Sequence, residues 1–325
     1  MKHSQKISVI IVNYNSLDHI DTCVTSVLNQ TYPDFEVIIV DNNSADDSLN
    51  YARTQFPGLI YVTNTENLGY AGGVCSALEY ASGQLIAPLN IDTEVADDWL
   101  AQMADFLDRN PGAAAVTPKI LLFNNRNRIN AMGMNVHVSG MAFCRHLYKE
   151  DDGLIEPQRV FALSGCSYLI RREILEQINN SVGQWDIYYD DVIISWLINL
   201  MGHDIWCTPG AVIYHKYALK MNRDKFLIYE RCRHFFVLSV LKPFTLLILS
   251  PVLIVTELLV VVYSLLKGRH YIKAKMGAIR SIFQQARSIR KKRAQYQQLR
   301  KKSDFRLLKR LSWNLEWGQL FRTLD

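Results

Sequence analysis

The chain has 325 residues, of which 49% are hydrophobic and 21% charged, values typical of a globular protein with one large or two ordinary domains. Its six cysteines are scattered without a Cys-x-x-Cys pair, which excludes an obvious thiol framework and indicates reduced core cysteines in the cytosol. The net charge is only +5, but residues 267–325 hold 17 Lys and Arg against 3 Asp and Glu, a local charge of +14 that leaves −9 elsewhere. This asymmetry favours an anionic partner for the tail, either a membrane surface or nucleic acid.

The first hundred residues alternate between β-branched apolar runs and short segments of helical character. The runs are "ISVIIV", "FEVIIV", "LIYVTN" and "QLIAPL", and helices are predicted between them at 18–29, 46–55 and 72–81. Buried strands separated by helices of about ten residues predict βαβ units and a parallel sheet covered on both faces. The segment before the first strand lacks the length and cleavage site of a signal peptide.

Polar residues gather where each of these strands ends, in "NYNS", "DNNSADDS", "NTENLGYAGG" and "NIDTEV". Ligands of open parallel sheets bind outside the carboxyl ends of the strands, so the four loops predict one binding site. The chain has no GxxxxGK[ST] motif, and "NLGYAGG" is not a GxGxxG motif. A bound diphosphate would therefore need another counter-charge, such as a divalent cation on a carboxylate, and Asp92 is the candidate.

The middle third of the chain is mixed. "VFALSGCSYLIRREILEQI" predicts a strand followed by a helix, and "HDIWCTPGAVIYHK" predicts two short strands around a Thr-Pro-Gly turn. Between these segments, "WDIYYDDVIISWLINLMG" places Asp190 and Asp191 before an apolar block. Two acids at this position would cap a helix and complement its dipole, or one of them would act as a catalytic base.

The stretch "PFTLLILSPVLIVTELLVVVYSLL" is long enough to span a bilayer, but it contains Pro251 and Glu257. A single crossing would place the basic tail outside the cytosol, against the positive-inside tendency. We therefore expect a re-entrant hairpin or in-plane helices at the cytoplasmic face of the cell membrane, with the amphipathic tail on the anionic leaflet. A soluble core or a dimer helix pair is the alternative. A nucleic-acid partner is not expected, because no recognition fold accompanies the basic tail.

The motifs "SVIIVNYNS", "VIIVDNNSADDS", "ENLGYAGG" and "LNIDTEVADDWL" resemble the nucleotide-binding half of the family 2 inverting glycosyltransferases. The likeness continues through "SGCSYLIRREILEQI", "WDIYYDDVIISW", "GHDIWCTPGAVIYHK" and "YERCRHFF", which resemble the bacterial rhamnosyltransferases of polysaccharide assembly. Together the motifs cover about residues 5–240. The resemblance implies an α/β GT-A fold with a mostly parallel nucleotide-binding sheet, a dTDP- or UDP-linked sugar donor, Mg²⁺ or Mn²⁺, and a glycan or lipid-linked acceptor.

On this resemblance the chain divides into a catalytic domain at 1–234, apolar membrane-associated helices at 235–266 and a basic helical tail at 267–325. The catalytic domain has a nucleotide-binding half at 1–100 and an acceptor half at 101–234.

The resemblance also implies a role for individual residues. Asp92 would bind the metal, with His215 as a second ligand of the metal or diphosphate, and Asp191 would be the catalytic base. The implied donor-binding residues are Asn13, Tyr14, Asn15, Asp41, Asn67, Gly69, Gly73 and Asn90. Contacts to the acceptor or to phosphate are expected from Asp190, Trp196, Arg231 and Arg233.

The chain departs from the family pattern near the predicted base. Close relatives carry another acid two residues after the acidic pair and an Arg after the Trp, where this chain has Ile193 and Leu197. Asp190 replaces Glu, and Cys232 stands where Asn is common. These departures leave open a second class of function, a catalytically weakened scaffold subunit that binds nucleotide. A nucleotidyltransferase is disfavoured because "NYNSLDH" is no Gly-rich phosphate loop, and a homo-oligomer stays open.

Overall fold

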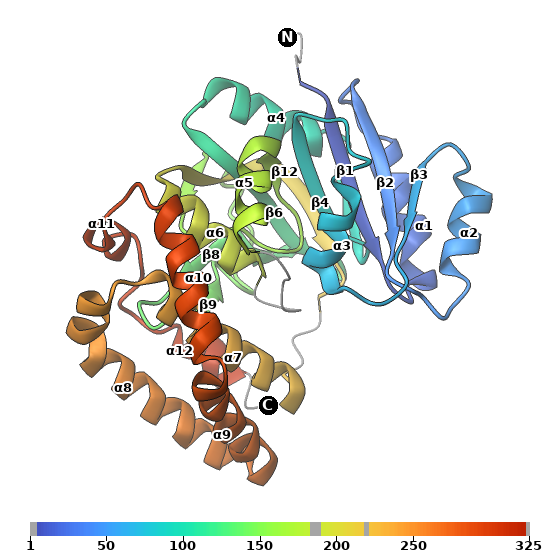
Figure 1. Cartoon of the computed structure of the whole chain (residues 1–325). Coiled ribbons are helices and arrows are strands. Elements are labelled where there is room, and N and C mark those ends of the chain that lie inside the picture. The colour runs from blue at the N-terminus through green and yellow to red at the C-terminus, as the bar shows by residue number, and fades with distance from the viewer. Residues whose placement is uncertain (1–4, 183–189, 218–220, 323–325) are drawn as a thin grey trace. The chain divides into compact units, whose positions relative to one another are not determined.

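The computed structural model describes residues 5–182, 190–217 and 221–322, which form two compact units (Figure 1). The sheet unit comprises 1–134, 144–187 and 203–217, and the helical unit comprises 135–143, 188–202 and 218–325. The chain therefore passes between the units several times. The helix that carries Asp191 belongs with the C-terminal helices, so the two units do not divide at residue 234.

The sheet unit contains a ten-stranded sheet in the order β10-β12-β6-β11-β4-β1-β2-β3, with β5 paired to β12 and β7 to β6. Its parallel half consists of β1 (Ile7–Asn13), β2 (Phe35–Asp41), β3 (Ile60–Thr63) and β4 (Leu85–Asn90). The remaining strands are β5 (Thr93–Val95), β6 (Ala113–Leu122), β7 (Asn125–Ala131), β10 (Gln158–Val160), β11 (Leu169–Arg171) and β12 (Asp204–His215). The predicted α/β class with a largely parallel sheet is confirmed.

Five helices accompany these strands: α1 (Leu17–Leu28), α2 (Ser48–Gln55), α3 (Gly69–Ala77), α4 (Trp99–Arg109) and α5 (Arg172–Val182). The chain runs outward from β1 to β3 through α1 and α2, and returns to β4 through α3. Right-handed crossovers therefore place α3 on the face opposite α1 and α2, as Figure 1 shows. Every residue of β1 is buried, because helices cover both sides of this strand.

Helix α3 approaches β1 closely at Gly73, which predicts a cost for any side chain there. A Cβ on Gly73 would lie 2.8 Å from Val12 Cγ1 and 3.2 Å from Asn42 Nδ2. We expect Gly73→Ala to lower the free energy of unfolding by about 1–3 kcal/mol through overpacking. Thermal unfolding measures this effect. Gly58→Ala is the control, because a Cβ placed there would meet no described atom within 4 Å beyond its two chain neighbours. An equal loss in both variants would contradict the packing argument.

The prediction of two short strands around Thr-Pro-Gly is wrong, because this segment belongs to one strand, β12. Its pairing with β6 shifts register between Thr208 and Val212 and then continues to His215. The intervening residues are absorbed as an irregularity instead of a turn. As a result, β12 reaches far enough along the sheet to pair with β5.

The helical unit contains α6 (Asp190–Met201), α7 (Arg223–Val240), α8 (Pro243–Lys267), α9 (Arg269–Gln284), α10 (Ala286–Leu299), α11 (Asp304–Leu308) and α12 (Trp317–Arg322). A two-stranded sheet of β8 (Met134–Val136) and β9 (Ala142–Cys144) lies at the boundary in sequence between the units. Helix α9 packs against both α7 and α8.

Helix α8 is continuous, so the hairpin form of the expected membrane segment is wrong. Pro251 cannot donate a backbone hydrogen bond to Leu247, but Ser250 Oγ donates to the Leu247 carbonyl at 2.8 Å instead. This bond satisfies the carbonyl that the proline would leave unpaired. By length and composition, α8 is apolar enough to cross a membrane.

Candidate active site

The ends of β1 and β2 are joined by buried polar contacts. Their parallel register places Asn13 beside Asp41, and both side chains are buried. Asn13 Nδ2 donates to Asp41 Oδ1 at 2.8 Å and to Ser48 Oγ at 2.8 Å. Asp41 Oδ2 accepts from the Ser44 amide at 3.1 Å. Asp41 thus holds a fixed carboxylate at the carboxyl edge of the sheet, where the sequence predicts recognition of a base.

The loop after β1 leaves one aromatic ring open to solvent. Asn15 adopts a left-handed φ of 49°, and its Oδ1 accepts from the Ala45 amide at 2.7 Å. Asn tolerates this conformation better than most residues. The turn holds Tyr14 with 48% of its surface exposed, as a nucleoside-stacking role would require.

The loop after β3 is fixed by amide side chains. Asn67 Oδ1 accepts from the Gly69 amide at 2.8 Å, and Gly69 has a φ of 72° that glycine adopts without strain. Asn42 Nδ2 donates to the Gly69 carbonyl at 2.8 Å and so ties this loop to β2. Asn42 is not among the residues predicted from the sequence, although it directly follows Asp41. The donor-binding roles of Asn67, Gly69, Gly73 and Asn90 stay predictions.

Strand pairing brings Asp92 and His215 together. β5 pairs with β12 so that His215 lies opposite Thr93, next to Asp92. His215 Nε2 is 3.3 Å from Asp92 Oδ1, and the Lys216 amide donates to the Asp92 carbonyl at 3.0 Å. The two predicted metal ligands are thus neighbours, although 122 intervening positions separate them in the chain.

A buried amide on β7 orients the His215 ring. Asn130 Oδ1 lies 2.9 Å from His215 Nδ1, and both residues are buried. An Nδ1–H that donates to Asn130 leaves the Nε2 lone pair directed toward Asp92. Asn130 carries no signal in the sequence, because it lies in the polar strand "NRNRINA" without any motif.

Asp92 and His215 fit a divalent cation. Asp92 Oδ1 is buried and has no hydrogen-bond partner among the described residues, while its nearest neighbour is the Nε2 acceptor. Two facing acceptor atoms are stabilised by a shared cation. Partial burial raises the pKa of Asp92, but the hydrogen bond and positive charge that His215 contributes when Nε2 carries a proton, as it can while no cation is bound, outweigh burial and hold this pKa below its usual value. Asp92 therefore stays a carboxylate at neutral pH, as a metal ligand must.

Two basic residues near Asp92, His19 and Lys216, are not among the site residues predicted from the sequence. His19 on α1 contributes to the low pKa of Asp92, and its Nδ1 lies 3.1 Å from Lys216 Nζ. Lys216 follows His215 directly, so a basic residue at this strand end was visible in the sequence. These groups place positive charge where the leaving diphosphate would need it.

In the helical unit, the predicted base occupies a distinctive position on α6. Of the twelve residues of this helix, all described, Asp191 alone is not buried. Asp191 Oδ1 accepts from the Val192 amide at 2.8 Å, and the Asp191 carbonyl accepts from Ser195 Oγ at 2.6 Å. The hydrogen bond from the Val192 amide fits a helix-terminal role for Asp191, while the partial exposure of Asp191 fits a catalytic base. The stretch 183–189 before α6 lies outside the described residues.

Asp190 predicts a pH-dependent stability. Burial, together with a smaller effect of the adjacent Asp191 carboxylate, raises the pKa of Asp190 to about 7. A raised acid pKa gives stability that is complete below the unfolded pKa of about 4 and is lost as the pH rises through about 7. We expect Asp190→Asn, which cannot ionise, to unfold at a higher temperature than wild type at about pH 8 and to differ less at about pH 5. If the difference in melting temperature between Asp190→Asn and wild type were the same at both pH values, this prediction would be contradicted.

Two predicted acceptor contacts are wrong. Trp196 is fully buried and packs edge-on against Phe236, with ring centroids 5.9 Å apart, so it is a core residue. Arg233 is 4% exposed and is engaged with Glu230 and Glu257, so its guanidinium is unavailable to phosphate. The contact predicted for the partly exposed Arg231 stays a prediction. Ile193 and Leu197, the departures from the family pattern, are buried core residues of α6.

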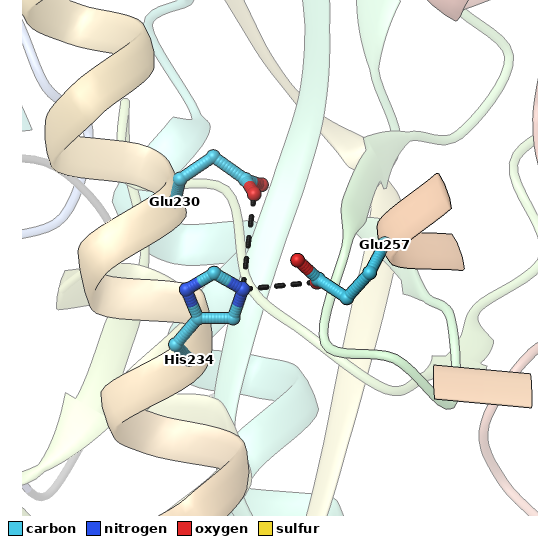
Figure 2. A group of neighbouring side chains, drawn as sticks. All are labelled: Glu230, His234 and Glu257. Carbon is cyan, nitrogen blue, oxygen red and sulfur yellow. Dashed lines mark hydrogen bonds and ion pairs between the residues drawn. The ribbon is translucent and has the colours of Figure 1, made fainter. Parts of the chain in front are cut away.

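Glu230, Arg233, His234, Glu257 and Lys275 form a second group of ionisable residues, which we call the charge cluster. Figure 2 shows Glu230 and His234 on α7 facing Glu257 on α8, in an arrangement that resembles a metal site. Its carboxylates are already paired, however. Arg233 donates to Glu230 at 2.8 Å, Lys275 contacts both carboxylates, and Arg233 also contacts Glu257. Two carboxylates balance two basic groups, so a divalent ion would add uncompensated positive charge.

Comparison with known proteins agrees with this architecture. Among solved structures, the chain resembles GalNAc-T7 with UDP, GalNAc and Mn²⁺ (TM-score 0.58, 20% identity, 73% of this chain and 48% of that one). It also resembles the mannosyltransferase PcManGT of Pyrobaculum calidifontis with GDP-Man and Mn²⁺ (TM-score 0.54, 17% identity, 94% and 87%). These likenesses show the GT-A fold.

Sequence comparison identifies relatives that match about two thirds of this chain. The poly-beta-1,6-N-acetyl-D-glucosamine synthase of Staphylococcus epidermidis is 26% identical over 64% of this chain, and the O-antigen biosynthesis protein RfbC of Myxococcus xanthus is 26% identical over 69%. The chain spans about half of the first protein, 49%, and 18% of the second. The family model for glycosyl transferase family 2 matches residues 8–178, from β1 through α5 and across the loops that hold Asp41 and Asp92. That match covers more than half of the sequence, and the chain therefore belongs to glycosyl transferase family 2.

Proposed function

We propose that this protein transfers a hexosyl group, with inversion, from a nucleoside-diphosphate-sugar to a hydroxyl of a glycan or lipid-linked acceptor. The observation that carries the proposal is the facing pair of Asp92 and His215 at the carboxyl edge of the sheet, beside two basic side chains. A nucleotide diphosphate needs such a combination of a cation site and positive charge. The polysaccharide-related names of the relatives favour an acceptor of the cell envelope.

The donor is proposed to carry a dTDP or UDP nucleotide. Its base and ribose would lie against Tyr14, Asn13 and Asp41, where one ring is exposed and one carboxylate is fixed. Rhamnose is the proposed sugar, on the resemblance to the rhamnosyltransferase subgroup. The buried Asp41 is a hydrogen-bond acceptor, which suits the N–H of a pyrimidine edge.

Asp92 and His215 would hold a Mg²⁺ or Mn²⁺ ion, which when bound supplies Lewis-acid charge to the departing diphosphate. Lys216 and His19 would add positive charge to the same phosphates. Asp191 would accept the proton of the acceptor hydroxyl as this oxygen attacks the anomeric carbon, and the bond to the diphosphate would break on the opposite side of the sugar. One carboxylate suffices, because a direct displacement has a single proton to remove.

The enzyme is proposed to act at the cytoplasmic face of the cell membrane as a peripheral protein. Sugar nucleotides are cytosolic, and the helical unit combines an exposed apolar helix with a basic tail. The acceptor would then be presented at the lipid surface.

The experiment that tests the function is release of nucleoside diphosphate from a panel of dTDP- and UDP-sugars. Purified protein would be incubated with Mn²⁺ and lipid extract from the source organism, with and without EDTA. Release from one donor that EDTA abolishes is expected. The alternative, a nucleotide-binding scaffold subunit, is motivated by Ile193 and Leu197 and predicts nucleotide binding without release from any donor.

Asn130→Ala tests whether His215 is oriented for a metal. Loss of the Nδ1 partner frees the ring to rotate, and we expect Mn²⁺ affinity to fall about 10–100-fold, measured by calorimetry without substrate. Asn135→Ala is the control, because that asparagine also lies in the polar middle segment but contacts Glu316 instead. Equal Mn²⁺ affinity in wild type, Asn130→Ala and Asn135→Ala would contradict the proposed ligand role of His215.

A further inference from the structure

The outer side of α8 is an uninterrupted apolar strip. Leu247, Ile254, Leu258 and Leu265 are 59–69% exposed, and they lie within about 40° of one another around the helix axis. The other side of the helix is buried at Thr256 and Val260. The strip runs along most of the 25 residues of α8 and bears no charge, since Glu257 points to the inner side. An exposed apolar surface of this length in a soluble protein marks an interaction site.

The inner side of α8 is fixed to α7 and α9 by the charge cluster. Glu257 contacts Arg233, lies 2.9 Å from His234 Nε2 and 2.5 Å from Lys275 Nζ. Tyr263 packs against Phe226 of α7, with ring centroids 5.9 Å apart. If α8 left this position to cross a bilayer, Arg233 and Lys275 would face Glu230 alone in a buried setting. That state is strongly disfavoured, so α8 remains part of the helical unit.

The exposed residues of the helical unit that follow α8 in the chain favour lipid with anionic headgroups as the partner of the strip. The helices that follow α8 present exposed basic side chains at Arg269, Lys273, Arg280, Arg287, Arg290 and Lys291. Trp313 and Trp317 are also about half exposed, and indole rings favour the membrane–water interface. A second copy of the chain as partner would bring two strongly basic tails together, whereas an anionic leaflet complements them.

We propose that the helical unit docks on an anionic membrane leaflet through the outer strip of α8, with this helix lying in the plane of the interface. This docking mode extends the proposed function and depends on it, because the proposed function is what places the acceptor at the lipid surface. The unit that binds the surface also contains α6, since the Leu200 carbonyl at its end accepts from the amides of Lys301 and Lys302 at 2.9 and 3.2 Å. The predicted base is thus carried by the same unit that contacts the lipid.

Depth measurement by nitroxide labels distinguishes an in-plane helix from a crossing helix. Leu247→Cys and Leu265→Cys would be labelled singly, in a chain with Cys75→Ser and Cys144→Ser because the other four cysteines are buried. The two positions are about 27 Å apart along the helix. In vesicles of phosphatidylcholine and phosphatidylglycerol, we expect both labels at the same depth, about 5–10 Å below the headgroups. One shallow label and one at the far leaflet would overturn the proposal.

Vesicle flotation tests the partner. Leu258→Asp is expected to weaken partitioning about tenfold or more, since it replaces buried apolar area by charge. Ile155→Asp, at a residue 68% exposed in the sheet unit, is expected to bind like wild type. Binding to pure phosphatidylcholine should be weaker than to vesicles with phosphatidylglycerol, because the basic residues then lack anionic lipid.

Some results of the same flotation series would contradict the proposed membrane docking. No binding to either vesicle, or equal loss in both Asp variants, would overturn the lipid assignment, and concentration-dependent sedimentation would then point to a second copy. Donor turnover with a water-soluble acceptor is measured in every variant. Turnover by the wild-type protein without vesicle binding would refute docking alone, and vesicle binding by the wild-type protein without turnover would refute the transferase alone.

Discussion

Asp191→Asn is expected to lower kcat for sugar transfer about 10²–10⁴-fold while the affinity for nucleotide stays unchanged. Asn is nearly isosteric with Asp and keeps an oxygen for the Val192 amide, so the local hydrogen bond at 2.8 Å can persist. What Asn cannot do is accept the proton of the acceptor hydroxyl. Steady-state turnover with the donor identified by nucleotide release, together with calorimetric nucleotide binding, measures the two quantities separately.

The control addresses the alternative that Asp191 only stabilises a helix terminus. Asp224→Asn removes a carboxylate from the first turn of α7, where its side chain is 80% exposed. A loss of the helix-dipole contribution costs about 0.3–1 kcal/mol in either variant. If both variants showed the same small change in melting temperature and the same activity, Asp191 would be a helix-terminal residue and not the base.

The nucleotide-binding half was predictable because its signals are local. Apolar runs such as "VIIV" fix β1 and β2, and parallel pairing then forces Asn13 and Asp41 to the same edge of the sheet. The predicted helices at 18–29 and 46–55 agree with α1 and α2 to within two residues. Helix α3 starts three residues earlier than predicted, at Gly69, because a glycine with positive φ opens it.

Other features depended on partners distant in the chain. Nothing in "NRNRINA" distinguishes Asn130 until β7 and β12 place it against His215. The family resemblance implied an acceptor contact for Trp196, but the packing of α6 against Phe236 buries this residue completely. Arg233 looked like a phosphate ligand near a membrane segment, and only the fold shows its carboxylate partners on α7 and α8. Sequence spacing gives no account of such long-range pairing.

Lys275→Met is expected to lower the free energy of unfolding of the helical unit by about 3–5 kcal/mol. Lys275 is completely buried, and its Nζ contacts both Glu230 and Glu257. Met fills nearly the same volume but carries no charge, so two carboxylates would remain with Arg233 as their only formally charged partner in the charge cluster. Burial raises the pKa of Glu230, but the larger opposing effects of Arg233 and Lys275 lower it to about 2, so Glu230 is ionised at neutral pH in wild type. Loss of the Lys275 charge removes one of the groups that lower this pKa.

Urea unfolding of Lys275→Met and of the exposed neighbour Lys273→Met makes the comparison. The two positions share α9, so propensity effects are equal and only burial and pairing differ. Lys273→Met should change stability by less than about 0.5 kcal/mol, as surface substitutions usually do. The loss in Lys275→Met should also shrink as the pH falls from about 4, near the unfolded pKa of Glu, through about 2, the folded pKa of Glu230, because a protonated glutamate no longer needs the lysine. A loss in Lys275→Met as small as that in the control would mean that desolvation of the buried ions cancels their attraction, and that apolar packing alone holds α8 in place.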